Sequence, residues 1–259
     1  VDSRLASGEI PPELPLQVYE YIRIMGLYGV SPAPAGAAAI YPKLRDALSE
    51  KRLLHSLLVA ATARRLAHLH RLNEESCELA GLVHDCAKCM PLQTQQRIAR
   101  EQRLLLDKET LASENMLHGP VGAVLAETEY GIHDPNILSA IRCHTTGRVG
   151  MLPADMVLYL ADKIEPGRRY YPALEAVRQL ADENLAAATL SSLRSTQAYV
   201  TRQRQTLHPA TQRVILWLER LVENGKAHIV PRACIRCFCC HEMCPAKAID
   251  VKRAGIFNL

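Results

Sequence analysis

The sequence predicts an all-α protein, and three observations lead to this prediction. Hydrophobic residues make up 48% of the 259 residues but aromatic residues only 5%, and Leu and Ala, which favour helices, are common among them. Between about residues 51 and 223, apolar side chains recur at helical spacing in one segment after another. Gly or Pro stands at the boundary of most of these segments, as is usual where helices begin or end.

The predicted helices fall into one main domain with a short extension at each end. Residues 1–40 are expected to form a helix, within "LPLQVYEYIRIMGLYG" at residues 14–29, and a Pro- and Ala-rich linker, "VSPAPAGAAA". Residues 41–224 form the main domain, with helices predicted at residues 53–70, 74–88, 119–131, 135–147, 153–167, 172–190 and 209–223. Residues 225–259 are rich in cysteine and break the helical pattern.

Charge and hydropathy limit the classes of function. The net charge is +4, and no dense block of Lys and Arg occurs. This argues against a dedicated nucleic-acid surface and leaves a small anionic substrate open. No apolar run reaches membrane-spanning length, and the start of the chain has no signal-peptide pattern, so a cytoplasmic protein without membrane contact is expected. The first residue is Val rather than Met, which is compatible with a fragment or a processed product.

The dipeptide His-Asp occurs twice, at His84-Asp85 and at His133-Asp134. Asp134 precedes Pro135 in a segment bounded by Gly, which is typical of a helix N-cap preceded by an exposed His. His84 and Asp85 instead end a strongly apolar helix, where a charged pair is costly unless something compensates it. A metal cation would compensate it.

Further side chains on neighbouring predicted helices could complete a metal site: His55, His118, His144 and Asp162. His55 is expected in the first turn of its helix, His118 just before a helix, and His144 at a helix end. Imidazole and carboxylate ligands without thiols suit a hydrolytic Fe, Mn or Zn centre rather than a structural zinc site. A lone His on an apolar helix is also often an ordinary core residue. The residues alone therefore leave both interpretations open.

Five segments resemble one protein family, in that family's order: "LVHDCAK", "HGPVGA", "AIRCHTTGRVGM", "YLADKIEPGR" and "LHPAT". Over about residues 52–220 they are similar to the YqeK-type symmetrical diadenosine tetraphosphate hydrolases of the HD phosphohydrolase superfamily. The resemblance implies an all-α HD-domain bundle that cleaves diadenosine tetraphosphate, a small dinucleoside polyphosphate, into two ADP. It also implies two divalent metals, with iron expected and manganese or another ion as the alternative.

The resemblance implies two groups of metal ligands that share one carboxylate. The first group comprises His55, His84, Asp85 and Asp162. The second comprises His118 and His144, with Asp85 as the bridging ligand. Two metals would lower the pKa of a bound water and neutralise phosphoryl oxygens. Asp85 and Lys88 are therefore the residues expected to act in catalysis.

The residues expected to bind the substrate near the metals are Lys88, Thr145, Thr146, Gly147 and Arg168. An ammonium at Lys88 could reach a phosphate, although an exposed lysine at a helix end explains it equally well. The polar turn at residues 145–147 could donate to phosphate or simply cap a helix. Arg168 could bind phosphate, which we favour, or pair with a carboxylate, and Arg169 is expected at the surface.

Nine cysteines, five of them in residues 234–244, indicate thiolate metal chemistry in a reducing compartment rather than disulfides. Four have the spacing C-x2-C-x2-C-x3-C: Cys234, Cys237, Cys240 and Cys244. With the following Pro245, they resemble one half of a two-cluster bacterial ferredoxin, which implies a 4Fe–4S cluster; a zinc knuckle is the alternative. A second copy of the chain or a redox partner would cover such a cluster. The cysteines in the main domain are expected to be packing residues: Cys77, Cys86, Cys89 and Cys143.

Two questions stay open at this point. Residues 4–29 resemble the closing helix of nicotinate mononucleotide adenylyltransferases, without that enzyme's nucleotide-binding loops, but an independent docking helix explains them as well. For the main domain, the alternatives to tetraphosphate hydrolysis are another HD-type nucleotidase or phosphodiesterase reaction and an electron-transfer module on a helical scaffold.

Overall fold

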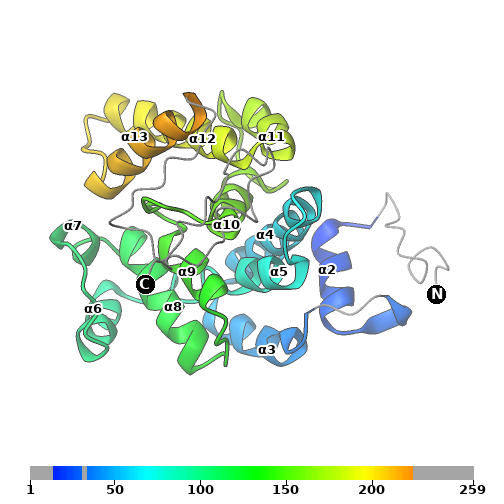
Figure 1. The fold of residues 1–259 in the computed structure, drawn as a ribbon. Coiled ribbons are helices and arrows are strands. Elements are labelled where there is room, and N and C mark those ends of the chain that lie inside the picture. Colours follow the sequence, from blue (N-terminus) through cyan, green and yellow to red (C-terminus); the bar gives the residue numbers. More distant parts are fainter. Residues whose placement is uncertain (1–13, 31–33, 224–259) are drawn as a thin grey trace, which may run out of the picture.

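The computed structural model describes residues 14–30 and 34–223, and within these ranges every regular element is helical (Figure 1). The predicted all-α fold is confirmed. The elements are α2 (Leu16–Ile24), η1 (Leu27–Gly29), α3 (Ala37–Ala47), α4 (Glu50–Leu69), α5 (Glu74–Val83), α6 (Leu92–Glu101), α7 (Lys108–Leu111), α8 (Glu114–Thr128), α9 (Pro135–Cys143), α10 (Pro153–Ile164), α11 (Leu174–Glu183), α12 (Leu185–Arg202) and α13 (Pro209–Glu223). None of these helices is long and apolar enough to cross a bilayer.

Helix α10 lies at the centre of the bundle. It packs against α4, α5, α9, α11 and α12 (Figure 1), and its residues 155–162 are all buried. A helix that is apolar nearly all round is expected in the middle of a helical domain. Any polar side chain on this helix, such as Asp162, therefore lies in the interior and needs partners there.

Helices α4 and α5 pack closely against each other. A Cβ at Gly81 of α5 would lie 2.7 Å from the Cα of Ala60 in α4, so only glycine allows this approach. Helix α5 begins with Asn73, whose side chain accepts a hydrogen bond from the backbone N–H of Ser76. The two helices carry His55 and His84, and their close packing brings these side chains together.

A network of buried charges fixes α2 to α4 and α5. Arg23 Nη1 lies 2.6 Å from Glu78 Oε1, and Arg64 Nη2 lies 2.9 Å from Glu20 Oε1. Both carboxyl groups are buried and each has an arginine partner, although burial still raises both pKa values, that of Glu20 to about 8. The predicted N-terminal helix is thus present as α2, and it packs on the main domain.

The structure differs from the predicted helices in three places. Helix α3 occupies residues 37–47, although residues up to 40 were expected to be linker; the run of Ala residues favours a helix here. Helices α6 and α7 were not predicted. The single helix predicted at residues 172–190 is divided at Asn184, which leaves the helical conformation (φ −151°) and caps α12 by accepting from the N–H of Ala187.

Two of the expected ligand positions also change. Helix α8 begins at Glu114, so His118 lies inside the helix rather than before it, and Gly119 and Pro120 are helical as well. His55 lies in the second turn of α4, because that helix begins at Glu50. Both shifts arise because the helices begin earlier than the apolar pattern does.

The cysteines of the main domain divide into two groups. Three are buried, as predicted for packing residues: Cys77, Cys86 and Cys143. For Cys89 the packing prediction is wrong, since it is exposed in the turn after α5. The predicted iron–sulfur ligands Cys234, Cys237, Cys240 and Cys244 lie outside the described residues.

Candidate metal centre

The six predicted metal ligands come together in the middle of the bundle, although they belong to five different helices or helix ends. They are His55 of α4, His84 at the C-cap of α5, Asp85 in the turn that follows, His118 of α8, His144 at the C-cap of α9, and Asp162 of α10. Five of them are buried and His55 is partly buried. Ionisable side chains do not gather in an interior unless they compensate one another or bind a cation.

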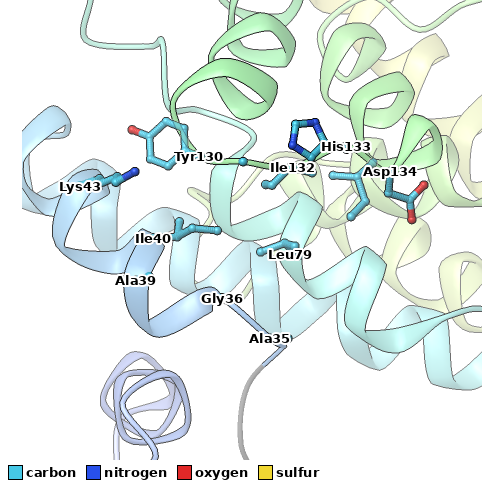
Figure 2. A pocket seen from close by; sticks show the side chains of 12 residues that line it. Ala35, Gly36, Ala39, Ile40, Lys43, Leu79, Tyr130, Ile132, His133 and Asp134 are labelled. Carbon is cyan, nitrogen blue, oxygen red and sulfur yellow. The ribbon is translucent and has the colours of Figure 1, made fainter.

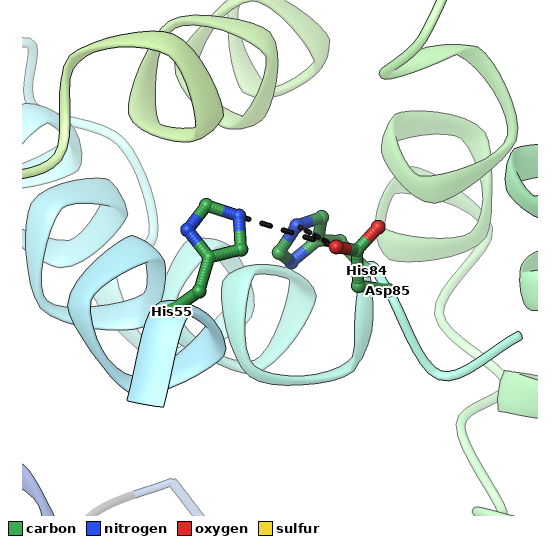
Figure 3. A group of neighbouring side chains, drawn as sticks. All are labelled: His55, His84 and Asp85. Atoms are coloured by element: carbon green, nitrogen blue, oxygen red, sulfur yellow. Dashed lines mark ion pairs between the residues drawn. The ribbon is translucent and has the colours of Figure 1, made fainter. Parts of the chain in front are cut away.

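The first group of ligand atoms consists of His55, His84, Asp85 and Asp162. The Nε2 atoms of His55 and His84 lie 4.0 and 3.6 Å from Asp85 Oδ2. Figure 3 shows both rings turned towards this carboxylate. Asp162 Oδ1 lies 3.1 Å from His55 Nε2 and 3.7 Å from His84 Nε2. His55, His84 and Asp85 therefore place three potential ligand atoms close together, and Asp162 Oδ1 lies beside the two imidazoles of this set.

The second group uses the other oxygen of Asp85. Asp85 Oδ1 lies 3.1 Å from His118 Nε2 and 3.8 Å from His144 Nε2. The two imidazole nitrogens are 3.0 Å apart. Asp85 thus directs Oδ2 to the first group and Oδ1 to the second, which is the arrangement of a carboxylate that bridges two metal ions.

Hydrogen bonds to backbone carbonyls fix the orientation of three of the histidines. The Nδ1–H of His84 donates to Gly81 O at 2.7 Å, and that of His144 donates to Ile141 O at 2.7 Å. His118 Nδ1 lies 3.1 Å from Glu114 O. In His84 and His144 the bond leaves Nε2 free as a lone-pair donor, which is the usual state of a metal-binding histidine; His118 Nδ1 lies beside both Glu114 O and Lys88 Nζ.

The buried nitrogens give a test of whether this donor set fits a metal. His84 Nε2 is buried and has no hydrogen-bond partner, a deficit that costs about 1–3 kcal/mol. If His118 and His144 both donate through Nδ1, their Nε2 lone pairs face each other at 3.0 Å. A cation among these atoms would remove both penalties. The side chains present therefore fit metal ions held by nitrogen and oxygen.

Protonation states at the centre also suit metal binding. Burial lowers the pKa of His84 to about 4 and lowers the pKa of His118 as well. Burial alone would raise the pKa of Asp85, but the imidazoles of His84, His118 and His144 outweigh burial and hold this pKa well below its usual value. Neutral imidazoles at His84 and His118 and an ionised Asp85 are the forms that coordinate metals. At His55, burial would lower the pKa, but the hydrogen bonds to Asp162 and Glu165 outweigh burial and raise it.

Three basic side chains form ion pairs with the carboxylates of Asp85 and Asp162. Arg52 Nη1 is 3.1 Å from Asp85 Oδ2, and Lys163 Nζ is 3.0 Å from Asp162 Oδ2. Arg168 donates from its guanidinium to the side chain and to the backbone carbonyl of Asp162. Burial would raise the pKa of Asp162, but Lys163 and Arg168 help to hold it well below its usual value. Of the two roles predicted for Arg168, the structure contains the pairing with a carboxylate.

Lys88 lies beside the second group of ligands. Its Nζ is 3.1 Å from Asn115 Oδ1 and 3.4 Å from His118 Nδ1, and burial lowers its pKa. The side chain is half-buried rather than exposed. Arg169, in contrast, is exposed as predicted. Lys88 therefore lies next to His118, a predicted metal ligand, whereas Arg169 is at the surface.

The turn at residues 145–147 follows the ligand His144 directly. Gly147 has a φ of 69°, and its N–H donates to Cys143 O at 2.8 Å, which closes the end of α9. The hydroxyl of Thr211, in the "LHPAT" segment, donates to Thr146 O at 3.0 Å. Helix capping thus accounts for Gly147, and α13 supports the turn from behind.

Three residues near the ligands were missed by the sequence analysis: Arg52, Lys163 and Glu165. Arg52 precedes His55 by three positions and so shares its helix face. Lys163 and Glu165 belong to the quoted segment "ADKIEPGR" and flank α10's end. Lys163 and Glu165 thus stand in a quoted segment and Arg52 does not. The role of all three depends on which atoms they contact, and spacing does not give that information.

The second His-Asp pair is remote from the centre. Asp134 Oδ1 accepts from the N–H of Asn136 at 2.8 Å and caps α9, while His133 is exposed; both predictions are confirmed. The pair lines a pocket of about 280 Å³ with Ile40, Lys43 and other residues (Figure 2), and none of the six ligands lines it.

Known proteins resemble this chain over the part that contains the centre. Residues 52–167 match the HD domain. The symmetrical bis(5'-nucleosyl)-tetraphosphatase of Bacillus subtilis is 35% identical over 178 residues, which are 68% of this chain and 93% of the relative. The Staphylococcus aureus protein of the same name is 42% identical over 53% of this chain and 70% of its own length.

Two further relatives extend this comparison. A probable nicotinate-nucleotide adenylyltransferase/Ap4A hydrolase of Mycoplasma genitalium is 31% identical, over 72% of this chain and 51% of the relative. The crystal structure of a predicted HD superfamily hydrolase involved in NAD metabolism, from Clostridium acetobutylicum, superposes with a TM-score of 0.68 at 38% identity, over 70% of this chain and 95% of the other. The chain therefore belongs to the HD-domain hydrolases, in the family of the symmetrical bis(5'-nucleosyl)-tetraphosphatases.

Proposed function

We propose that this protein hydrolyses diadenosine tetraphosphate symmetrically to two ADP and that it uses two divalent metal ions, iron or manganese. The observation that carries the proposal is the position of Asp85 between two groups of imidazoles, with one carboxylate oxygen directed to each. The names of the relatives in this family support the choice of substrate.

The proposed ligands are the two groups described above. His55, His84 and Asp162 would hold the first ion, His118 and His144 the second, and Asp85 both. Nitrogen and carboxylate donors without thiolates suit iron, manganese or zinc. Bound at such a site, two divalent ions lower the pKa of water and neutralise the phosphoryl oxygens at the bond that breaks.

The protein's own cations would receive the polyphosphate. Arg52, Lys88, Lys163 and Arg168 all place a positive group within hydrogen-bond distance of a metal ligand. An anionic substrate that approaches the ions meets these groups first, and they would orient it for attack. We also propose that Thr145 and Thr146, in the turn after His144, donate hydrogen bonds to phosphate oxygens.

Product analysis tests the proposal. The full chain is incubated anaerobically with Fe²⁺ or Mn²⁺ and diadenosine tetraphosphate, and ADP is expected as the only nucleotide product. Chelation should stop the reaction, and the metal alone should restore it. AMP and ATP in equal amounts would show that a different anhydride is attacked. Faster turnover of mononucleotides or cyclic nucleotides would favour another HD-type reaction.

The 4Fe–4S cluster at Cys234, Cys237, Cys240 and Cys244 remains a proposal that rests on their spacing alone. Anaerobic reconstitution should give iron and acid-labile sulfide in the tail. Stoichiometric zinc without sulfide would favour the zinc knuckle instead. Because the proposed hydrolytic ligands are complete without these cysteines, their replacement by Ser should leave hydrolysis unchanged.

A further inference from the structure

Glu165 lies directly behind the first group of ligands. It is the C-cap residue of α10 and is only 3% exposed. Its Oε1 atom lies 3.1 Å from Nδ1 of His55, while Nε2 of the same ring faces Asp162 at 3.1 Å. His55 therefore stands between two carboxylates, one on each ring nitrogen.

His55 differs in this respect from the other three histidines of the centre. Their Nδ1 atoms lie against the backbone carbonyls of Gly81, Glu114 and Ile141. Those carbonyls belong to the histidines' own helices, but Glu165 comes from a different helix. An ionised carboxylate only accepts hydrogen bonds, so it requires a proton on Nδ1 and leaves Nε2 to the metal. A carboxylate partner also increases the basicity of the imidazole.

The second oxygen of Glu165 shapes the turn that follows. Oε2 accepts from the N–H of Gly167, and the N–H of Arg168 donates to Glu165 O at 3.0 Å. Gly167 also packs against α4, where a Cβ at this position would lie 2.9 Å from Leu58 Cδ1. Arg178 holds Glu165 O from outside, at 3.1 Å. One buried side chain thus contacts both a proposed metal ligand and the turn that leads to Arg168.

We propose that Glu165 is a positioning residue of the first metal site: it fixes the Nδ1–H form of His55 and holds the turn that presents Arg168. This inference rests on the metal site of the proposed function. It adds a residue that acts through His55 and Gly167 and that has no contact with the substrate.

The two hydrogen bonds make an isosteric test possible. In Glu165→Gln, the single amide oxygen can accept from His55 or from Gly167, but not from both. If it accepts from His55, the amide NH₂ faces the N–H of Gly167, so two donors oppose each other. If it accepts from Gly167, the NH₂ faces Nδ1 of His55 and favours the form that carries its proton on Nε2. Either arrangement weakens the first site.

Mn²⁺ binding to the full chain, measured by equilibrium dialysis, tests the proposal. Wild-type protein should bind two ions. Glu165→Gln should bind one of them about 10–100-fold more weakly, as is typical for loss of an outer hydrogen-bond partner, and should retain the His118/His144 ion. Glu175→Gln is the matched control, because exposed Glu175 pairs with Arg178 at 2.7 Å but does not contact His55; both affinities should be unchanged.

A second measurement does not depend on how well a variant folds. In wild-type protein loaded with Zn²⁺, the ¹⁵N NMR spectrum of the histidine side chains should show His55 protonated at Nδ1. A proton on Nε2 would overturn the inference, as would wild-type Mn²⁺ affinity in Glu165→Gln. Both results would leave the proposed hydrolysis intact, whereas a wild-type chain that binds no divalent ion would contradict the proposed function itself.

Discussion

His84-Asp85 and His133-Asp134 are the same dipeptide in two different environments. The first lies at the C-terminal end of α5 and is buried among the side chains proposed to bind metal. The second lies at the N-terminal end of α9, where Asp134 caps the helix and His133 is exposed. The dipeptide alone therefore does not indicate a function. It must also be known whether the pair stands at the N-terminal or the C-terminal end of its helix.

The polarity of a helix explains the difference. Its N-terminus presents free N–H groups, which a carboxylate can accept, so Asp134 is satisfied by Asn136. Its C-terminus presents free carbonyls, which an imidazole N–H can reach, so His84 is held by Gly81. Asp85 then has no hydrogen-bond donor from its own helix, and its carboxylate contacts side chains of other helices, such as Arg52 and His118. A His-Asp pair after a helix is thus suited to bind a cation, whereas one before a helix is suited to cap it.

The largest difference between the pairs is expected for the aspartates. Asp85→Ala should remove a ligand shared by both groups, so both ions should be lost. Turnover should fall by well over about 100-fold, the effect expected for the loss of one ion, because the proposed reaction needs both. Asp134→Ala should keep both ions and full turnover. Metal content and steady-state rates of the two variants provide the comparison, and two retained ions in Asp85→Ala would refute the bridging role.

The histidines should differ by a smaller margin. His84→Ala removes a ligand of the first group only, so one ion should be lost while the His118/His144 ion stays. Turnover should still fall at least about 100-fold, since the proposed reaction needs two ions. Metal analysis of the purified variant measures this directly. Loss of both ions in His84→Ala would mean that the two sites do not fill independently.

Much of the centre could be predicted from the sequence. The apolar patterns of the helices predict the all-α fold, whereas the proposed ligand set comes from segments that resemble the family, because the six residues alone left the metal site open. The N-cap role of Asp134 could also be predicted, because the residues that indicate it, such as the following Pro135, are its neighbours in the sequence.

The features that could not be predicted depend on packing between segments that are distant in the sequence. Glu165 contacts His55 across 110 positions of sequence, and Arg52 reaches Asp85 from a neighbouring helix. No local pattern records such contacts. The break at Asn184 was missed because Asn inside an apolar pattern is compatible with a continuous helix, and only the packing of α11 and α12 reveals it.

A third comparison uses the residue four positions after each histidine. Lys88 follows His84 and lies beside His118, whereas Ile137 follows His133 and is buried in the core. Lys88→Ala should raise KM or lower kcat about tenfold, because a charged hydrogen bond to phosphate contributes about 1.5–3 kcal/mol, and both ions should stay. Ile137→Val should lower the free energy of unfolding by about 0.5–1.5 kcal/mol without changing KM. Loss of metal from Lys88→Ala would indicate a structural role for Lys88 in place of substrate binding.

The smallest effects are expected within the second pair itself. Asp134→Ala removes the N-cap of α9 and should lower the free energy of unfolding by about 1 kcal/mol, which is about 2–4 °C in the melting temperature of a domain of this size. His133→Ala should change the free energy of unfolding by less than about 0.5 kcal/mol, as is usual for an exposed side chain. Thermal melts with and without Mn²⁺ separate these effects from metal binding. Since α9 ends at the ligand His144, Asp134→Ala also tests whether the cap is felt at the far end of the helix. A wild-type Mn²⁺-induced rise in melting temperature in this variant would show that the cap stabilises the helix without positioning the ligand.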